Sequence, residues 1–203
     1  MSFAFLSVDA AGAGALARSA IDRGYRDLSA IFEERDGWLV PVTIPGEDEH
    51  EAVGVADLSA LTKIEVRPGR NPGIRLEPDT GCWYDVSPHR ALVLCPPSQG
   101  DEVRAQLGDR FSLDVTGAWS VIGLAGPEAT TVLRRLTHLH HFPSGGEIAH
   151  VQGHVLERAG VFWVLVAQEY GHYVWEVAVD RASALGGGAV GVDGLARYRG
   201  GAA

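Results

Sequence analysis

Short apolar or alternating stretches, each bounded by Gly, Pro or charged residues, recur along the chain and predict β-strands. Pro41 in the first stretch has no backbone N–H to donate, so we expect that strand at the edge of a sheet. The predicted strands are Trp38–Ile44, Leu61–Arg67, Cys82–Val86, Ala91–Cys95, Ala118–Leu124, Val151–Leu156, Val161–Ala167 and Ala189–Val192.

A helical period follows the strand at Ala118–Leu124. After Pro127, apolar residues recur every three or four positions up to Leu136, which predicts an amphipathic helix. Pro127 suits the first turn of that helix, where its missing N–H costs no hydrogen bond. Two shorter helices are predicted at Gln99–Leu107 and in the acidic run Gly46–Ala52, whose adjacent charges are expected to face solvent.

The stretch Tyr170–Leu185 fits two periods. With a period of two, Trp175 and Val177 lie on one face of a strand. With a period of 3.6, Tyr173 and Val177 share one face of a helix. Gly186, just after the stretch, is typical of a helix C-cap, and we therefore favour the helix.

The order of these elements indicates an α+β fold. From Ala118 onward, a strand, a helix and a hairpin of strands follow the split βαβ, or ferredoxin-like, pattern. Residues 1–27 are rich in small side chains and are expected to form an N-terminal arm or peripheral helix. Residues 28–203 are expected to form one domain, in which residues 71–112, beginning with turn-rich sequence, form a smaller inserted module.

The charge balance narrows the class of partner. The 203 residues include 17 basic and 26 acidic side chains, and the formal net charge of −9 repels phosphate backbones and anionic membrane surfaces. We therefore expect no nucleic acid and no membrane as partner. The N-terminal residues lack the pattern of a secretory leader, and no stretch approaches about 18 apolar residues, so we expect a cytoplasmic protein.

Most patterns of chemically reactive residues favour structural explanations. Cys82 and Cys95 are too far apart for a CxxC motif, and Cys95 lies in an apolar run that predicts a buried thiol. The histidines of His138–His141 are expected in a loop over His138–Gly146, and His150 and His154 are expected to flank a strand, so no metal site is predicted. The sequence has no GxxxxGK[ST] motif and no predicted strand followed by GxGxxG, which disfavours flavin or NAD on this chain.

Several sequence blocks occur in order over residues 28–185. They are Val53–Ser59 with the strand Lys63–Arg67, Asp114–Thr116 with Ile122–Pro127, Val132–Leu136, Pro143–Gly146, and Trp163–Val166 leading to Glu169–Glu176. In this order they resemble the folate-binding domain of the glycine-cleavage aminomethyltransferase (T-protein) family, and more closely its short relatives, the gamma subunits of heterotetrameric sarcosine oxidase. The resemblance implies a T-protein-like (GcvT-like) folate-binding domain built from two ferredoxin-like modules.

The resemblance also implies candidate residues for folate binding. Glu176 aligns with the family glutamate that holds the pterin ring, an assignment that needs the strand, because on a helix this residue is expected to face solvent. Tyr170 and Trp175 are candidates to stack on the pterin, although aromatic residues at this spacing are more often part of a core. Asp57 is the remaining folate-site candidate, with a structural turn as its alternative role.

The family's proposed catalytic aspartate lies in a loop that is missing here, since Asn71–Asp85 is too short to contain it, and we predict no catalytic residue. The leading hypothesis is a gamma-like, non-catalytic accessory subunit of a sarcosine-oxidase-type complex, in which flavoprotein subunits hold any flavin. One alternative is a stand-alone transferase that moves a one-carbon unit to tetrahydrofolate, with Asp57 or Asp85 in proton transfer. The other is a scaffold that has lost its ligand.

Overall fold

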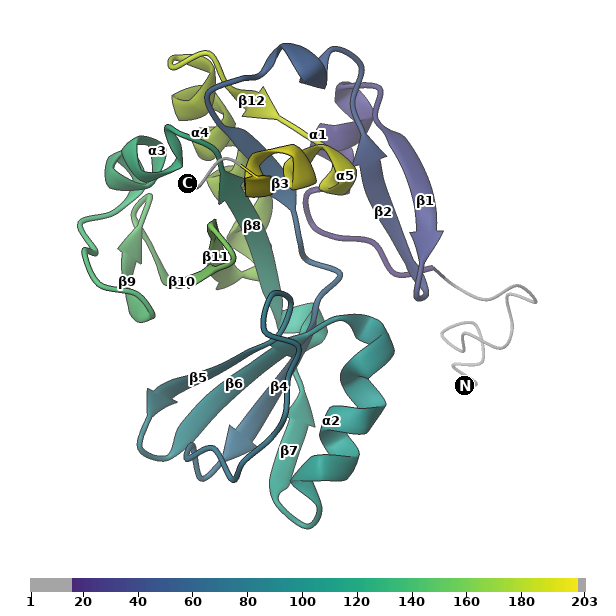
Figure 1. Cartoon of the computed structure of the whole chain (residues 1–203), viewed down its shortest axis with the longest axis vertical. Coiled ribbons are helices and arrows are strands. Elements are labelled where there is room, and N and C mark those ends of the chain that lie inside the picture. The colour runs from purple at the N-terminus through teal and green to yellow at the C-terminus, as the bar shows by residue number, and fades with distance from the viewer. Residues whose placement is uncertain (1–15, 201–203) are drawn as a thin grey trace, which may run out of the picture.

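Two β-sheets stacked along the long axis form the frame of the chain in the computed structural model, which describes residues 16–200 (Figure 1). The larger sheet has six strands and the smaller has four. Part of the predicted N-terminal arm, residues 1–15, lies outside the described residues.

The larger sheet contains β3 (Gly54–Asp57), β8 (Trp119–Ala125), β9 (Ser144–Ile148), β10 (Val151–Arg158), β11 (Val161–Ala167) and β12 (Gly188–Ala189). Helices α3 (Ala129–Leu136) and α4 (Gly171–Ser183) connect its strands. The spatial order β12-β3-β8-β11-β10-β9 is that of a ferredoxin-like βαββαβ module, with β3 inserted between its first and last strands and β9 added at an edge. The predicted α+β fold class is confirmed.

The smaller sheet contains β4 (Thr62–Arg67), β5 (Cys82–Ser87), β6 (Arg90–Cys95) and β7 (Phe111–Asp114), and α2 (Gly100–Leu107) precedes β7. Its strand order is β5-β6-β4-β7, and every neighbouring pair is antiparallel. This is a second ferredoxin-like module, in which a loop of residues 68–81 takes the place of the first helix. The sheet draws its strands from both sides of residue 71.

Shorter elements complete the described chain. They are α1 (Asp22–Asp27), the hairpin of β1 (Ile31–Arg35) and β2 (Trp38–Thr43), α5 (Val192–Leu195), and the 3-10 helices η3 (Glu47–Glu49), η4 (Pro97–Gln99), η5 (Thr116–Ala118), η6 (Gln168–Tyr170) and η7 (Ala196–Gly200). Because β1 and β2 form a two-stranded sheet, Pro41 lies on an edge strand, as predicted.

Three apolar clusters hold these layers together. Helices α3 and α4 pack on one face of the larger sheet, where Leu133 and Trp175 are buried. The other face of the larger sheet packs against the smaller sheet, with Trp163 and Leu92 among the buried residues. Helix α2 covers the far face of the smaller sheet with Val103. The junction between the sheets is therefore a buried layer that both modules share.

Most predicted strands are confirmed within one or two residues, and α4 confirms the helix within Tyr170–Leu185. Three predictions need correction. The strand predicted at Ala189–Val192 is the short β12, which ends at Ala189, and Val192 already begins α5. The helix predicted at Gly46–Ala52 is a single 3-10 turn, and Glu47 in this acidic run is buried where solvent exposure was expected. The loop predicted at His138–Gly146 ends in β9, whose first residues include two glycines and therefore gave no strand signal.

Candidate functional site

The chain crosses between the two sheets twice, and the two crossings lie side by side. Residues 58–61 lead from β3 to β4, and residues 115–118 lead from β7 back to β8. The Leu58 N–H donates to the Val121 carbonyl at 2.8 Å, and the Val115 N–H donates to the Lys63 carbonyl at 2.9 Å. The first crossing is thus hydrogen-bonded to β8, and the second crossing is hydrogen-bonded to β4.

Lys63 joins the two crossings with its ammonium group. The side chain is fully buried, and Nζ donates to the carbonyls of Ser59 at 2.6 Å and Thr116 at 3.2 Å. Burial lowers the pKa of Lys63 to about 7, while the charges of Asp57 and Asp114 favour the protonated form. The Lys63 ammonium group therefore links the two crossings by hydrogen bonds, and its charge depends on pH near neutrality.

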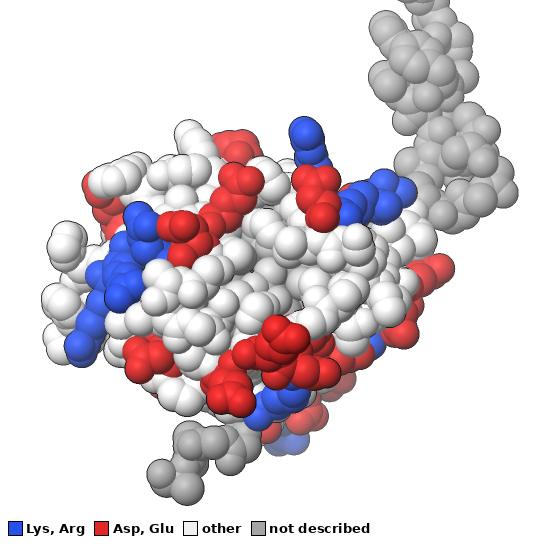
Figure 2. All heavy atoms as spheres, turned by 90° about the horizontal axis from the view of Figure 1, so that it is seen from above, with Lys and Arg blue, Asp and Glu red and all other residues white. Residues whose placement is uncertain are grey.

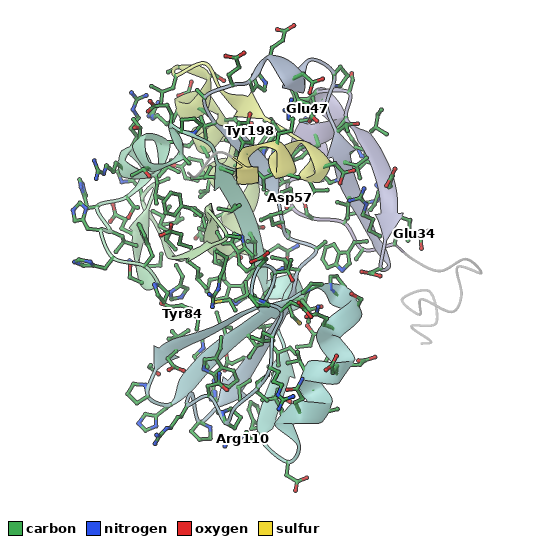
Figure 3. All side chains as sticks on the ribbon, viewed as in Figure 1. Glu34, Glu47, Asp57, Tyr84, Arg110 and Tyr198 are labelled. Carbon is green, nitrogen blue, oxygen red and sulfur yellow. The ribbon has the colours of Figure 1, made fainter. Side chains whose placement is uncertain are left out.

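Asp57 ends β3, beside the first crossing and near the centre of the molecule (Figure 3). Its Oδ1 accepts a hydrogen bond from the Ser59 N–H at 2.9 Å, and its Oδ2 accepts one from the Ser19 hydroxyl, which precedes α1. Burial raises the pKa of Asp57, and the hydrogen bonds and the Lys63 charge oppose this rise. Both carboxylate oxygens of Asp57 therefore already accept hydrogen bonds from other residues of the chain.

An apolar cavity of about 190 Å³ opens at the junction of the sheets. Gly123 of β8 leaves room for the side chain of Leu58 at this cavity, because a Cβ atom at position 123 would lie only 2.8 Å from Leu58 Cδ1. The lining residues come from the first crossing, the loop before β5, β11 and the C-terminal segment: Leu58, Leu61, Thr80, Val161, Trp163, Val192, Leu195 and Ala196. This lining can hold an apolar or aromatic group but contains no carboxylate or imidazole.

A second cleft, of about 320 Å³, lies where β5 meets β8 and β10, and Tyr84 marks this border in Figure 3. The Tyr84 hydroxyl and His154 Nδ1 are 3.0 Å apart, and the Trp119 ring lies 5.5 Å from the His154 ring between centroids. Burial, and then the charge of Arg90, lower the pKa of His154, which favours the neutral imidazole. The cleft thus combines aromatic surfaces with one neutral hydrogen-bonding pair.

The four predicted folate-site residues do not line one cavity. Glu176 lies on the exposed side of α4, with Oε1 3.3 Å from Nε2 of His172. Trp175, one residue earlier, is 4% exposed and packs in the core beneath the helix. Tyr170 is exposed just before α4, and Asp57 is buried at the end of β3. The helical period of α4 directs Trp175 into the core and Glu176 to the exposed side, and Tyr170 lies outside this helix.

Other reactive groups are dispersed. Within residues 16–200, no group of three or more His, Cys, Asp or Glu side chains is placed to hold a metal ion. Cys82 and Cys95 are buried free thiols, and burial raises the pKa of both, that of Cys95 to about 11. No helix in the described part of the chain is long and apolar enough to cross a membrane.

Two ferredoxin-like modules with one shared core give this chain a T-protein-like fold. In particular, aminomethyltransferase T of the glycine cleavage system from Bartonella henselae superposes on 91% of this chain with a TM-score of 0.67 and 14% identity, and the match spans 62% of that protein. A chain of the heterotetrameric sarcosine oxidase from Corynebacterium sp. U-96 superposes on 84% of this chain and 96% of its own length, with a TM-score of 0.58 and 15% identity. No family model and no curated protein matches the sequence.

Sequence patterns did not single out Lys63 or Tyr84, and His154 was considered only as a metal ligand together with His150. For Lys63 a signal was present, because strand alternation places it on the same face as Leu61, where a charged side chain is unusual. Tyr84 and His154 lie 70 positions apart and meet only through the packing of the two sheets. No local pattern could have indicated that pair.

Proposed function

We propose that this chain is a gamma-like accessory subunit of a heterotetrameric sarcosine-oxidase-type complex in folate-linked one-carbon metabolism. In this role it has no catalytic residue of its own, and partner flavoprotein subunits hold the flavin. It supplies an interface and part of the wall of the chamber in which the one-carbon product is captured. The fold supports the proposal, since a chain of such a complex shares it over 96% of its length.

The observation that carries the proposal is the apolar character of the cavity at the sheet junction. General acid–base catalysis needs an ionisable group within hydrogen-bond reach of the substrate. Thr80 contributes the polar side chain of this cavity, and the other lining side chains are apolar. Of the two candidates for proton transfer in a transferase, Asp57 and Asp85, neither lines this cavity. Asp57 is also 4% exposed, with its two carboxylate oxygens hydrogen-bonded to Ser19 and Ser59.

Tetrahydrofolate enters the proposal as a molecule held mainly by a partner. Sites that enclose a drug-sized ligand typically have volumes of about 300–1,000 Å³. The junction cavity has about 190 Å³, which suits a single ring system against Trp163 better than a whole folate. A partner subunit would therefore bind most of the folate while this chain closes one side.

The edge strand β7 offers a surface for a partner chain. It pairs with β4 on one side, and no strand from residues 16–200 lies along its other edge. Phe111 and Leu113 alternate along β7 on one face, and 57% and 52% of their surfaces are exposed. A free sheet edge with aligned apolar side chains is typical of a protein–protein contact.

The proposal is tested by purifying the tagged full-length chain from the cells that produce it. We expect a larger complex with flavin absorbance and sarcosine-dependent release of hydrogen peroxide, and neither property in the chain purified alone. An isolated chain that binds tetrahydrofolate and transfers a one-carbon unit would contradict the proposal in favour of the stand-alone transferase, and Glu176 would then be mutated first. A chain that has neither partners nor folate affinity would be the scaffold without ligand.

A further inference from the structure

A basic cavity of about 480 Å³ lies between α3, α4 and the turn that joins β9 to β10. Its charged lining consists of Arg134 and Arg135 from α3, Arg181 from α4, and Glu147 from β9. Figure 2 shows Lys and Arg atoms gathered on the side of the molecule that carries α3 and α4 in Figure 1. The protein as a whole has a net charge of −9, so this concentration of positive charge is local.

The arginines of this cavity are largely free to bind an external anion. Among the described residues, Arg134 and Arg135 have no hydrogen-bond or ion-pair partner. Arg181 contacts Asp180 at 2.5 Å, but both side chains are exposed and adjacent in sequence. Exposed pairs of this kind contribute little stability, so an anionic ligand can compete for the guanidinium.

The rim opposite the helices is a two-residue turn with an unusual backbone. Ala149 and His150 have φ values of 45° and 67°, which residues other than glycine seldom adopt. The turn is fixed to the end of α3, because the Ala149 N–H donates to the Leu136 carbonyl at 2.7 Å and Thr137 Oγ1 donates to the Glu147 carbonyl at 2.6 Å. The cavity is therefore preformed, with His150 held at its rim.

Arginine near the end of a helix also has a structural explanation, since it faces the negative end of the helix dipole. Arg134, Arg135 and Arg181 all lie in last turns. Each helix end carries about half an elementary charge, whereas each guanidinium carries a whole one. The three guanidinium groups of the lining outweigh the ends of two helices and the carboxylate of Glu147. Asp180 offsets the charge of Arg181 from outside the lining, so Arg134 and Arg135, which have no carboxylate partner within residues 16–200, carry most of the attraction for anions.

We propose that this basic cavity binds a small polyanion, a molecule with a phosphate group or at least two carboxylates. Guanidinium groups recognise both anions through paired N–H donors. Tyr173 and Val177 of α4 and Leu136 of α3 add an apolar wall for the remainder of the ligand. The volume lies within the range of small-molecule sites. This binding goes beyond the accessory role and does not depend on it.

Calorimetric titration of the full chain at low salt tests the proposal, with inorganic pyrophosphate and citrate as separate probes. We expect at least one probe to bind at one site per chain with a Kd of about 1 mM or tighter. Binding of pyrophosphate alone indicates a phosphate ligand, and binding of citrate alone a carboxylate ligand. Arg134→Gln and Arg181→Gln should each weaken binding about tenfold, because each removes a charge-assisted hydrogen bond.

Arg23→Gln is the matched control, since Arg23 is exposed on α1 and is not part of the cavity. It removes the same charge and should change the Kd by less than about twofold. Arg134→Lys keeps the charge without the planar donors and should give an intermediate Kd. Failure of both probes to saturate would overturn the proposal, as would an equal loss of affinity in Arg23→Gln.

Discussion

The buried Lys63 makes the stability of the module junction depend on pH. Its pKa is lowered from the usual 10.5 to about 7, so between these values the unfolded chain binds a proton that the folded protein has released. Raising the pH through this window therefore stabilises the fold. Below about pH 7 the lysine is charged in both states, and the full cost of its burial is present.

Lys63→Met tests this linkage. The free energy of unfolding of the native sequence, minus that of the variant, should rise by about 3–5 kcal/mol between pH values of about 7 and 10. Denaturant unfolding at a series of pH values measures both proteins. Burial raises the pKa values of Cys82 and Cys95, so these thiols make the free energy of unfolding fall as the pH rises. Both proteins contain them, so the difference between native sequence and variant cancels their contribution. A difference that stays flat across this range would show that the Lys63 pKa is not lowered.

Gly24 shows how the absence of one side chain admits a large one. It lies in α1, and a Cβ atom at this position would overlap the six-membered ring of Trp175, which itself packs 5.1 Å from Tyr25 between ring centroids. Gly24→Ala should reduce the free energy of unfolding by about 1–3 kcal/mol, although alanine favours a helix. Gly117→Ala is the control in urea unfolding, because open space surrounds Gly117. Equal losses in the two variants would rule out the clash as the cause.

At the scale of elements, the structure shows why some strands were predictable and others were not. The strand at Val161–Ala167 was predicted with its exact bounds because its continuous apolar run is bounded by turn residues. All four residues of β3 are buried, so that strand lacks the alternation of a half-buried one. The opposite holds for β7, where Phe111 and Leu113 are exposed on an edge. The apolar residues of β7 therefore did not mark which side of the strand faces the core.

The candidate cavities were beyond local patterns for a related reason. Leu58, Thr80, Val161 and Leu195 line the junction cavity from four separate segments of the chain. Their proximity follows from strand order and from the loop that replaces a helix, neither of which a period of two or 3.6 specifies. The chemistry of single residues could be predicted, but their grouping required the fold.

One buried carboxylate fixes the start of α5. Glu47 Oε2 accepts hydrogen bonds from the N–H groups of Ile44 at 3.0 Å and Gly191 at 2.7 Å, and Gly191 directly precedes the helix. Glu47 is 6% exposed, unlike the neighbours in its acidic run. The carboxylate therefore ties the turn η3 to the C-terminal segment.

Glu47→Ala should lower the free energy of unfolding by about 2–4 kcal/mol, because two buried N–H groups lose a charged acceptor. Glu49→Ala in the same turn is the control, since Glu49 is exposed, and its effect should stay within about 0.5 kcal/mol. Chemical denaturation of both variants measures the difference. If the two substitutions have similar effects, the hydrogen bonds of Glu47 do not hold the segment.

At the scale of the whole molecule, the assembly prediction concerns β7. The double variant Phe111→Ser, Leu113→Ser should abolish co-purification with flavoprotein partners, while changing the stability of the isolated chain by less than about 0.5 kcal/mol. Ile31→Ser is the control, because Ile31 is 59% exposed on the separate hairpin. Size-exclusion chromatography with light scattering measures the complexes. Retention of the complex by the double variant would place the interface elsewhere.

The neighbouring positions of the two crossings make the smaller sheet separable from the larger one in chain order. Strands β3 and β8 are antiparallel partners, with Asp57 opposite Ile122, so they would form a plain hairpin if residues 58–118 were absent. The smaller sheet is therefore an insertion at the tip of that hairpin. A gene could gain or lose this segment in one event, and every strand of the larger sheet would keep its neighbours and direction. The chain order thus accommodates two modules without any rearrangement of the larger sheet.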